Sequence, residues 1–211
     1  SPHLHLTRSY SRNTAIPYFM LDAVVEIAML DGATDTENPV EAFFARTSKL
    51  RELFKFEFYF PRRAGYRSEI ENRVHERFAD WEDVVQGAEA GVRDALNDAP
   101  LLVAHGVLRS FVDAYRIVAN VLADAGADAV DDESSFLAQC LKTGKQQLLQ
   151  RRVFSAESIS KSLYQTGLQL ARYRGLLAAN REVERRAFHE EFRRITDRLD
   201  VILAITLAKA D

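Results

Sequence analysis

The sequence of 211 residues has few of the residues that form disulfides and tight turns. Its single cysteine, Cys140, excludes an internal disulfide and a cysteine zinc cluster, and fits a reducing compartment. Nine glycines and five prolines favour long helices over a turn-rich β fold. No run reaches the roughly 18 to 20 uncharged apolar residues that a membrane span needs. The first residues also lack the basic start and apolar core of a signal peptide.

The composition that remains is that of an ordinary globular protein. Hydrophobic residues make up 47% and charged residues 28%, which is enough to bury a core in one large domain or two small ones. The formal net charge of −3 argues against a general nucleic-acid binder. Because the chain begins with Ser rather than Met, we expect it to be a piece of a longer protein.

Residues 8–30 are predicted to form a central helix. After a polar start this stretch is almost continuously apolar, and after Pro17 only Asp22 and Glu26 interrupt it. These two carboxylates are four residues apart and therefore share one helical face. A helix that is apolar around most of its circumference is typically buried among other helices.

Apolar residues recur at helical spacing through most of the remaining chain. Further helices are predicted at 38–54, 68–85, 86–97, 101–123, 133–152, 155–176 and 181–209. The aromatic tract 56–60 is either a short strand or the end of a helix, and Pro61 would stop either one. The predicted fold is therefore an all-α bundle of about seven or eight helices, with one short strand near 56–60 as the open alternative.

Local signals predict several helix ends. Asn38 before Pro39 is a good helix start, and Glu41 is placed to reach back to it. Ser155 is predicted to cap a later helix. The last helix has an apolar stripe of Phe188, Phe192, Ile195, Leu199 and Ile202. Its opposite side is predicted to carry Arg185, Arg186, Arg193, Arg194 and Arg198.

The acidic connection 124–132 is the best internal boundary. It divides residues 1–123, with the central helix and acidic helices, from the basic helices of 133–211 packed on the same core. Both are expected to belong to one C-terminal domain of a longer chain. Lys and Arg outnumber Asp and Glu from 142 to 198, which fits either an anionic membrane surface or a solvated helix face.

One pair of residues resembles a catalytic pattern. His75 and Asp80, a potential general base and a potential orienting carboxylate, are separated by four residues. On a continuous helix their side chains would point about 140° apart. We therefore expect His75 to lie on a helix surface, with no catalytic part.

The other candidate side chains make no complete site either. His3 and His5 stand without further metal ligands, and His105 is expected in the core or half-buried. His189, with two neighbouring glutamates, lacks the spacing of a metalloprotease helix. Cys140 is expected to be a buried small hydrophobe. The sequence predicts no catalytic residue, no metal site and no cofactor.

Three features in order carry a resemblance to a known family. They are Tyr10-Ser11-Arg12-Asn13 leading into an apolar helix, the tract Glu57-Phe58-Tyr59-Phe60, and the helix that bears Tyr115, followed by three more helices. In this the chain resembles the C-terminal region of the membrane-associated glycerol-3-phosphate and dihydroxyacetone-phosphate acyltransferases. The resemblance covers nearly the whole chain.

The resemblance implies a role in the first committed step of phospholipid synthesis. The family transfers an acyl group from acyl-CoA or acyl carrier protein to the 1-hydroxyl of glycerol 3-phosphate, using a His-x4-Asp signature. That signature lies N-terminal to the region resembled, so this chain is expected to support a catalytic part of the same protein. The expected location is the cell membrane, peripherally on the cytoplasmic side. Acyl-chain preference and the choice of acceptor stay open.

Tyr10, Arg12 and Asn13 have two readings. Arg12 would form an ion pair and Asn13 would cap the first helix, or this polar start would dock against the catalytic part. The alternative for the whole chain is a stand-alone helical interaction or ligand-binding module, such as the effector domain of a regulator. A regulator usually brings a basic helix-turn-helix, and none is visible here.

Overall fold

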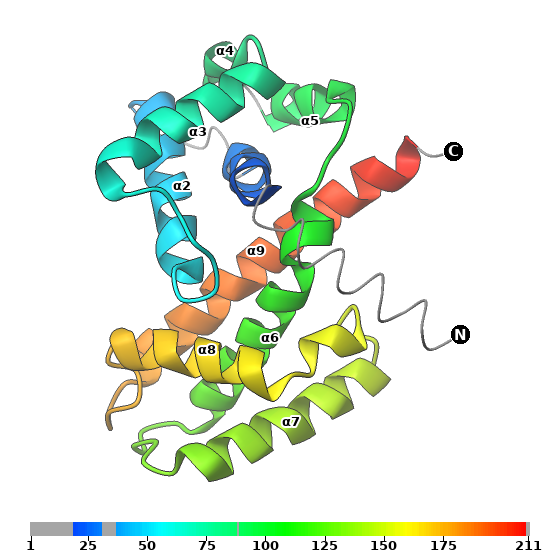
Figure 1. The fold of residues 1–211 in the computed structure, drawn as a ribbon. Coiled ribbons are helices and arrows are strands. Elements are labelled where there is room, and N and C mark those ends of the chain that lie inside the picture. The colour runs from blue at the N-terminus through cyan, green and yellow to red at the C-terminus, as the bar shows by residue number, and fades with distance from the viewer. Residues whose placement is uncertain (1–18, 31–36, 88, 210–211) are drawn as a thin grey trace. The chain divides into compact units, whose positions relative to one another are not determined.

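The computed structural model describes residues 19–30, 37–87 and 89–209 of the chain (Figure 1). Residues 19–30 are helical. The helices that follow are α2 (Pro39–Phe54), α3 (Arg63–Arg77), α4 (Trp81–Gln86), α5 (Glu89–Asp98), α6 (Ala104–Asp124), α7 (Glu133–Leu149), the 3-10 turn η1 (Ala156–Ser158), α8 (Lys161–Tyr173) and α9 (Glu182–Ala208). The described residues contain no β-strand, and the prediction of an all-α fold is confirmed.

The chain divides into two compact units. The first consists of residues 1–107 and 198–211, and the second of residues 108–197. Both divisions fall inside helices, in α6 and in α9. The predicted boundary at 124–132 is not one of them, since that connection lies wholly inside the second unit.

The segment 19–30 lies at the centre of the first unit, as predicted. It is the dark blue helix in Figure 1, and α2, α3, α5 and the start of α6 surround it. Every residue from 22 to 30 is buried, which only a helix enclosed on all sides can achieve. A cluster of aromatic rings lies in the same unit, where the Trp81 ring centroid is 5.0 Å from that of Phe43 and 5.7 Å from that of Phe44.

The alternative of a strand at 56–60 is wrong. Helix α2 ends at Phe54, well before Pro61, and the chain then turns. The backbone N–H groups of Glu57 and Phe58 both donate to the Phe54 carbonyl, at 2.9 and 3.0 Å. These donors are thus used within the turn and cannot pair with a neighbouring strand.

The single helix predicted at 68–85 is two helices. The chain leaves the helical conformation at Phe78, which has φ −140° and ψ 96° and begins the short turn between α3 and α4. The predicted apolar stripe is nevertheless buried throughout, at Ile70, Val74, Phe78, Trp81 and Val85. The spacing of apolar residues survives the break, so periodicity alone could not reveal it.

Helix starts follow local capping signals in part. The Asn38 side chain accepts the Glu41 N–H at 3.1 Å at the start of α2, as predicted, while the Glu41 carboxylate accepts hydrogen bonds from Arg67. The prediction that Ser155 caps a long helix is wrong. Ser155 precedes only η1, and α8 begins after Ser160.

Two glycines let the helices of the second unit approach closely. A Cβ on Gly144 of α7 would collide with the Tyr164 hydroxyl of α8. A Cβ on Gly167 of α8 would lie 3.1 Å from Val118 and 3.2 Å from Tyr115, both on α6. The two positions therefore set how tightly α8 packs against its neighbours.

Arg185 corrects the predicted polar face of α9. The apolar stripe of α9 is buried as predicted, but Arg185 is 0% exposed rather than solvated. Its guanidinium donates to the carbonyls of Leu176, Gly126, Asp128 and Ala178, at 2.8, 2.7, 2.8 and 3.0 Å. It thereby joins the turns that follow α6 and α8 through their backbone carbonyls.

Candidate functional site

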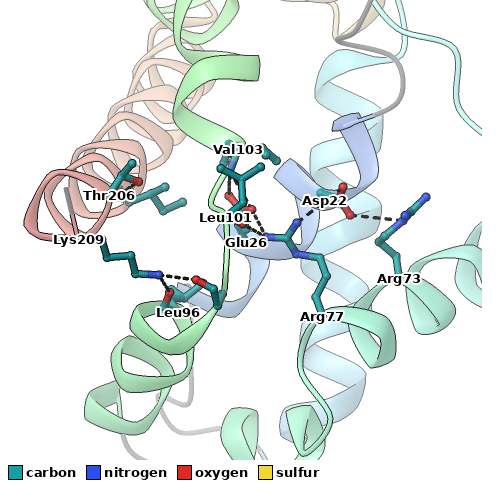
Figure 2. Close-up of polar contacts among 12 residues, drawn as sticks. Asp22, Glu26, Arg73, Arg77, Leu96, Leu101, Val103, Thr206 and Lys209 are labelled. Carbon is teal, nitrogen blue, oxygen red and sulfur yellow. Dashed lines mark hydrogen bonds and ion pairs between the residues drawn. The ribbon is translucent and has the colours of Figure 1, made fainter.

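The polar interior of the first unit is built on the two carboxylates that interrupt the central helix (Figure 2). Asp22 is 6% exposed and Glu26 is 0% exposed. Opposite them stand Arg73 and Arg77 of α3, which are also four residues apart and so form a matching row. The Arg73 Nε lies 3.3 Å from Asp22 and an Arg77 nitrogen lies 2.6 Å from Glu26. A second Arg77 nitrogen lies 3.7 Å from Asp22.

Glu26 also caps α6, although 77 residues separate it from Val103. The Val103 N–H lies 3.0 Å from both carboxylate oxygens, and the Ala104 N–H donates at 2.7 Å. The residues just before α6 are Leu101, Leu102 and Val103, none of which has a capping side chain. Glu26 thus supplies acceptor oxygens for the backbone N–H groups at the start of α6. It joins the segment 19–30 to both α3 and α6.

The environment raises the pKa of both carboxyl groups. Burial is the main cause for Glu26 and raises its pKa to about 7, against the opposing effects of the Ala104 N–H, Arg77 and the Val103 N–H. Burial likewise raises the pKa of Asp22, opposed by Arg77 and Arg73. A general base must reach the proton that it removes. With no exposed surface, Glu26 is placed to position helices rather than to contact a substrate.

His75 and Asp80 do not form a base and its orienting carboxylate. The prediction assumed a continuous helix, but the chain leaves the helical conformation at Phe78, between these two residues. Both side chains are exposed to solvent. The Trp81 indole N–H donates to the His75 Nε2 at 3.1 Å, and the two rings meet edge to face. The imidazole nitrogen that would accept a substrate proton is therefore already used by a neighbouring side chain.

The remaining sequence candidates also have structural environments. His105 is half-buried and Cys140 is fully buried, both as predicted, and burial raises the pKa of the Cys140 thiol to about 12. Burial, with a smaller effect of Arg116, lowers the pKa of His189. No set of three or more potential metal ligands occurs in the part of the chain that the structure describes. His3, His5, Tyr10, Arg12 and Asn13 lie outside that part.

Two open hollows on the second unit do not gather a catalytic set. One, of about 520 Å³, has Arg174 and Glu191 in its lining, and these pair with each other at 2.6 Å. The other, of about 400 Å³, is lined by acidic residues that include Asp124 and Asp132. Asp132 caps α7 and Asp124 accepts the Asn120 amide. Their charged groups thus serve local structure.

Sequence reasoning recognised Asp22 and Glu26 but missed their partners. Arg73 and Arg77 carry one usable signal, which is that they repeat the four-residue spacing of the two carboxylates. Nothing in the local sequence marks the start of α6 as the third partner. None of the helices in the described residues is both long and apolar enough to span a membrane.

These features define a helical protein region in which buried charges join the helices. The described side chains form no catalytic constellation. The chain matches the family described as the glycerol-3-phosphate acyltransferase C-terminal region, over residues 1–180. It belongs to that family.

Three curated proteins named "Putative acyltransferase plsB1", one from Mycobacterium bovis and two from strains of Mycobacterium tuberculosis, are each 40% identical to it over 205 residues. Each match covers 94% of this chain and 33% of the relative, so the chain spans about a third of the length of these proteins. No solved structure matches it.

Proposed function

We propose that this chain is the C-terminal, non-catalytic helical part of a glycerol-3-phosphate 1-O-acyltransferase. The parent enzyme would convert acyl-CoA and sn-glycerol 3-phosphate into 1-acyl-sn-glycerol 3-phosphate and CoA. The observation that carries the proposal is the family match over residues 1–180. The relatives are named as putative acyltransferases, and two thirds of their length lies outside the match.

The role proposed for the chain is to support a catalytic part of the same protein. The ion pairs and hydrogen bonds of Glu26 hold the segment 19–30, α3 and the start of α6 together. Helices joined by such buried charges give a surface of fixed shape, and a docked catalytic part needs such a surface to keep its groups in place. The His and Asp that perform acyl transfer would belong to that part.

The central test measures acyl transfer by the full-length enzyme carrying His75→Ala. Because the His75 Nε2 accepts the Trp81 N–H, we expect turnover within about threefold of wild type and a stability loss of about 1 kcal/mol. Glycerol 3-phosphate and dihydroxyacetone phosphate are supplied in parallel, which also identifies the acceptor. A thousandfold loss of turnover with the fold intact would instead place His75 in the catalytic machinery.

The polar start at Tyr10, Arg12 and Asn13 is proposed as the docking site for the catalytic part. These residues directly precede the segment 19–30, whose burial makes it the fixed core of the first unit. Arg12→Ala in the full-length enzyme is expected to lower turnover. If activity and stability both match wild type, the docking proposal fails.

The parent enzyme is proposed to lie peripherally on the cytoplasmic side of the cell membrane. Its product would be a lipid, and the excess of Lys and Arg from 142 to 198 suits an anionic surface. A carbonate wash of isolated membranes is expected to release the protein. Retention in the washed membrane pellet would contradict a peripheral location.

A further inference from the structure

The most basic part of the chain lies in the second unit. Residues 134–181 contain eight Lys and Arg residues but one acidic residue, Glu157, in a chain whose net charge is −3. Three of these cations are neutralised locally, since Arg172 pairs with Glu133 at 2.7 Å, Arg174 with Glu191 at 2.6 Å and Arg181 with Glu184 at 2.9 Å. Four others lie in the second half of α7 and in the turn after it, where the described residues offer them no ion pair.

Two large apolar side chains stand exposed in the same stretch of the chain as these four cations. Leu149, the last residue of α7, is 86% exposed and Phe154 is 56% exposed. The cations beside them are also exposed. We call this set the α7 tip, and it consists of Lys142, Lys145, Leu149, Arg151, Arg152 and Phe154. It spans the second half of α7 and the turn that follows this helix (Figure 1).

The α7 tip is held in place rather than loosely attached. The backbone N–H of Phe154 donates to the buried Asp113 carboxylate at 2.9 Å, and the Arg116 guanidinium donates to the Arg152 carbonyl. The Arg109 guanidinium lies 5.5 Å from the centre of the Phe154 ring. The structure therefore fixes the backbone under Phe154 while leaving its ring exposed.

Arg151 occupies a backbone position that normally favours glycine. Helix α7 ends with the Arg152 N–H bonded to the Gln147 carbonyl and the Arg151 N–H bonded to that of Leu148, and Arg151 has φ 57°. Helix α8 ends with the same pair of hydrogen bonds, but there Gly175 takes the position, with φ 70°. An arginine side chain adopts this conformation at a cost that glycine avoids. A binding role for the cation would explain its presence at this position.

We propose that the α7 tip docks onto an anionic lipid bilayer, with Leu149 and Phe154 entering the headgroup region and the four cations contacting lipid phosphates. This inference rests on the proposed membrane location and assigns it to particular residues. Charge complementarity favours the bilayer, because exposed apolar side chains in a stretch rich in unpaired cations suit a surface that is anionic outside and apolar beneath. Cations at a helix C-terminus also complement the helix dipole, but this does not account for the exposed Leu149 and Phe154.

Vesicle flotation of the full 211-residue chain tests the proposal without relying on acyl transfer. We expect binding to vesicles of phosphatidylcholine with phosphatidylglycerol, and much weaker binding to pure phosphatidylcholine. Lys142→Gln with Lys145→Gln should weaken anionic binding roughly 25-fold, at about fivefold for each cation. Leu149→Ser with Phe154→Ser should weaken it by roughly tenfold or more for each side chain. Circular dichroism checks that each variant is folded.

A matched control is Tyr173→Ser, which removes an aromatic ring that is 63% exposed at the end of α8. It should leave vesicle binding unchanged. Equal binding to both kinds of vesicle, or unchanged binding by the Leu149 and Phe154 double variant, would overturn the proposal. An effect of the cations without one of Leu149 and Phe154 would also overturn it, in favour of an acidic protein partner. In each case acyl transfer by the full-length enzyme would still stand as a separate result.

Arg151→Gly separates binding from stability. Glycine relieves the positive φ, so the variant should melt about 1–3 °C higher than wild type. It also loses one cation, so anionic vesicle binding should fall about fivefold. A variant with a higher Tm and undiminished vesicle binding would show that the Arg151 side chain plays no part at the membrane.

Discussion

Replacing Glu26 with alanine tests whether one buried carboxylate joins three parts of the first unit. The substitution leaves the guanidinium of Arg77, whose side chain is only 17% exposed, without its partner at 2.6 Å. It also removes the acceptor of the Val103 and Ala104 N–H groups, of which Ala104 is fully buried. Burying the charged form of Glu26 is itself unfavourable, as its raised pKa indicates. Replacing Glu26 with alanine nevertheless leaves the donors of Arg77, Val103 and Ala104 without this acceptor.

The expected loss is large for a single substitution. Removing one partner of a buried ion pair costs about 3–5 kcal/mol. Because Arg77 keeps Asp22 at 3.7 Å, we expect a loss near the lower end of that range. Glu76→Ala is the matched control. Glu76 pairs with Arg73 at 3.3 Å, but its side chain is 65% exposed, so its loss should cost less than about 1 kcal/mol.

Trp81 provides a local reporter for this experiment. It is the one tryptophan of the chain, it is 1% exposed, and it packs on Phe43 in the same unit as Glu26. Urea unfolding followed by its fluorescence therefore reports on the first unit, and far-UV circular dichroism reports on the whole chain. A Glu26→Ala loss no greater than that of Glu76→Ala would refute the assignment of Glu26 as the joint.

Three further predictions concern pH and packing. Because the folded-state pKa of Glu26 is raised to about 7, the folded chain still binds a proton that the unfolded chain releases near 4.5. The contribution of Glu26 to stability therefore falls as pH rises from about 4.5 to 7, by up to ~1.4 kcal/mol per pH unit. Glu26→Gln should remove that slope in urea titrations at several pH values. Arg185→Lys should lower the free energy of unfolding, followed by circular dichroism, by about 2–3 kcal/mol, since an ammonium has three donors for four carbonyls. Replacing the exposed Arg186 with lysine should change it little. Equal effects of the two substitutions would contradict the role of Arg185. Gly144→Ala should cost about 1–3 kcal/mol, because the added Cβ collides with the Tyr164 side chain of α8. Gly106→Ala should instead stabilise α6 by up to about 1 kcal/mol, because no atom lies within 4 Å of the added Cβ. Thermal melts that show the same sign for both variants would count against the packing argument.

Features encoded by neighbouring residues could be predicted from the sequence. The burial of 22–30, the Asn38 cap and the apolar stripe of α9 each depend on spacing within one helix or on the residues at its end. The scarcity of glycine and proline, together with apolar residues at helical spacing, is likewise enough to predict an all-α fold. Local preferences and burial agree at these places, so the pattern is a sufficient guide.

Features that depend on partners distant in sequence could not be predicted. The apolar stripe keeps its spacing across the break at Phe78, so the hydrophobic pattern does not reveal this break. The sequence predicts Arg185 on the polar face because arginine is normally exposed, yet two of its four acceptors lie in a turn far from it in sequence. For Glu26, the spacing identified a shared face, but the start of α6 as its partner followed only from the folded chain.

The contacts of Arg185 bear on the order in which the second unit assembles. Its acceptors Gly126 and Asp128 lie 59 and 57 residues earlier in the chain, and both turns must be in place before one guanidinium can bind them together. Such a contact closes a long loop, so it is expected to form after the folding transition state rather than before it. Loss of the Arg185 contacts would then act mainly on the rate of unfolding. The lifetime of the folded second unit, more than the speed at which it forms, would depend on this one side chain.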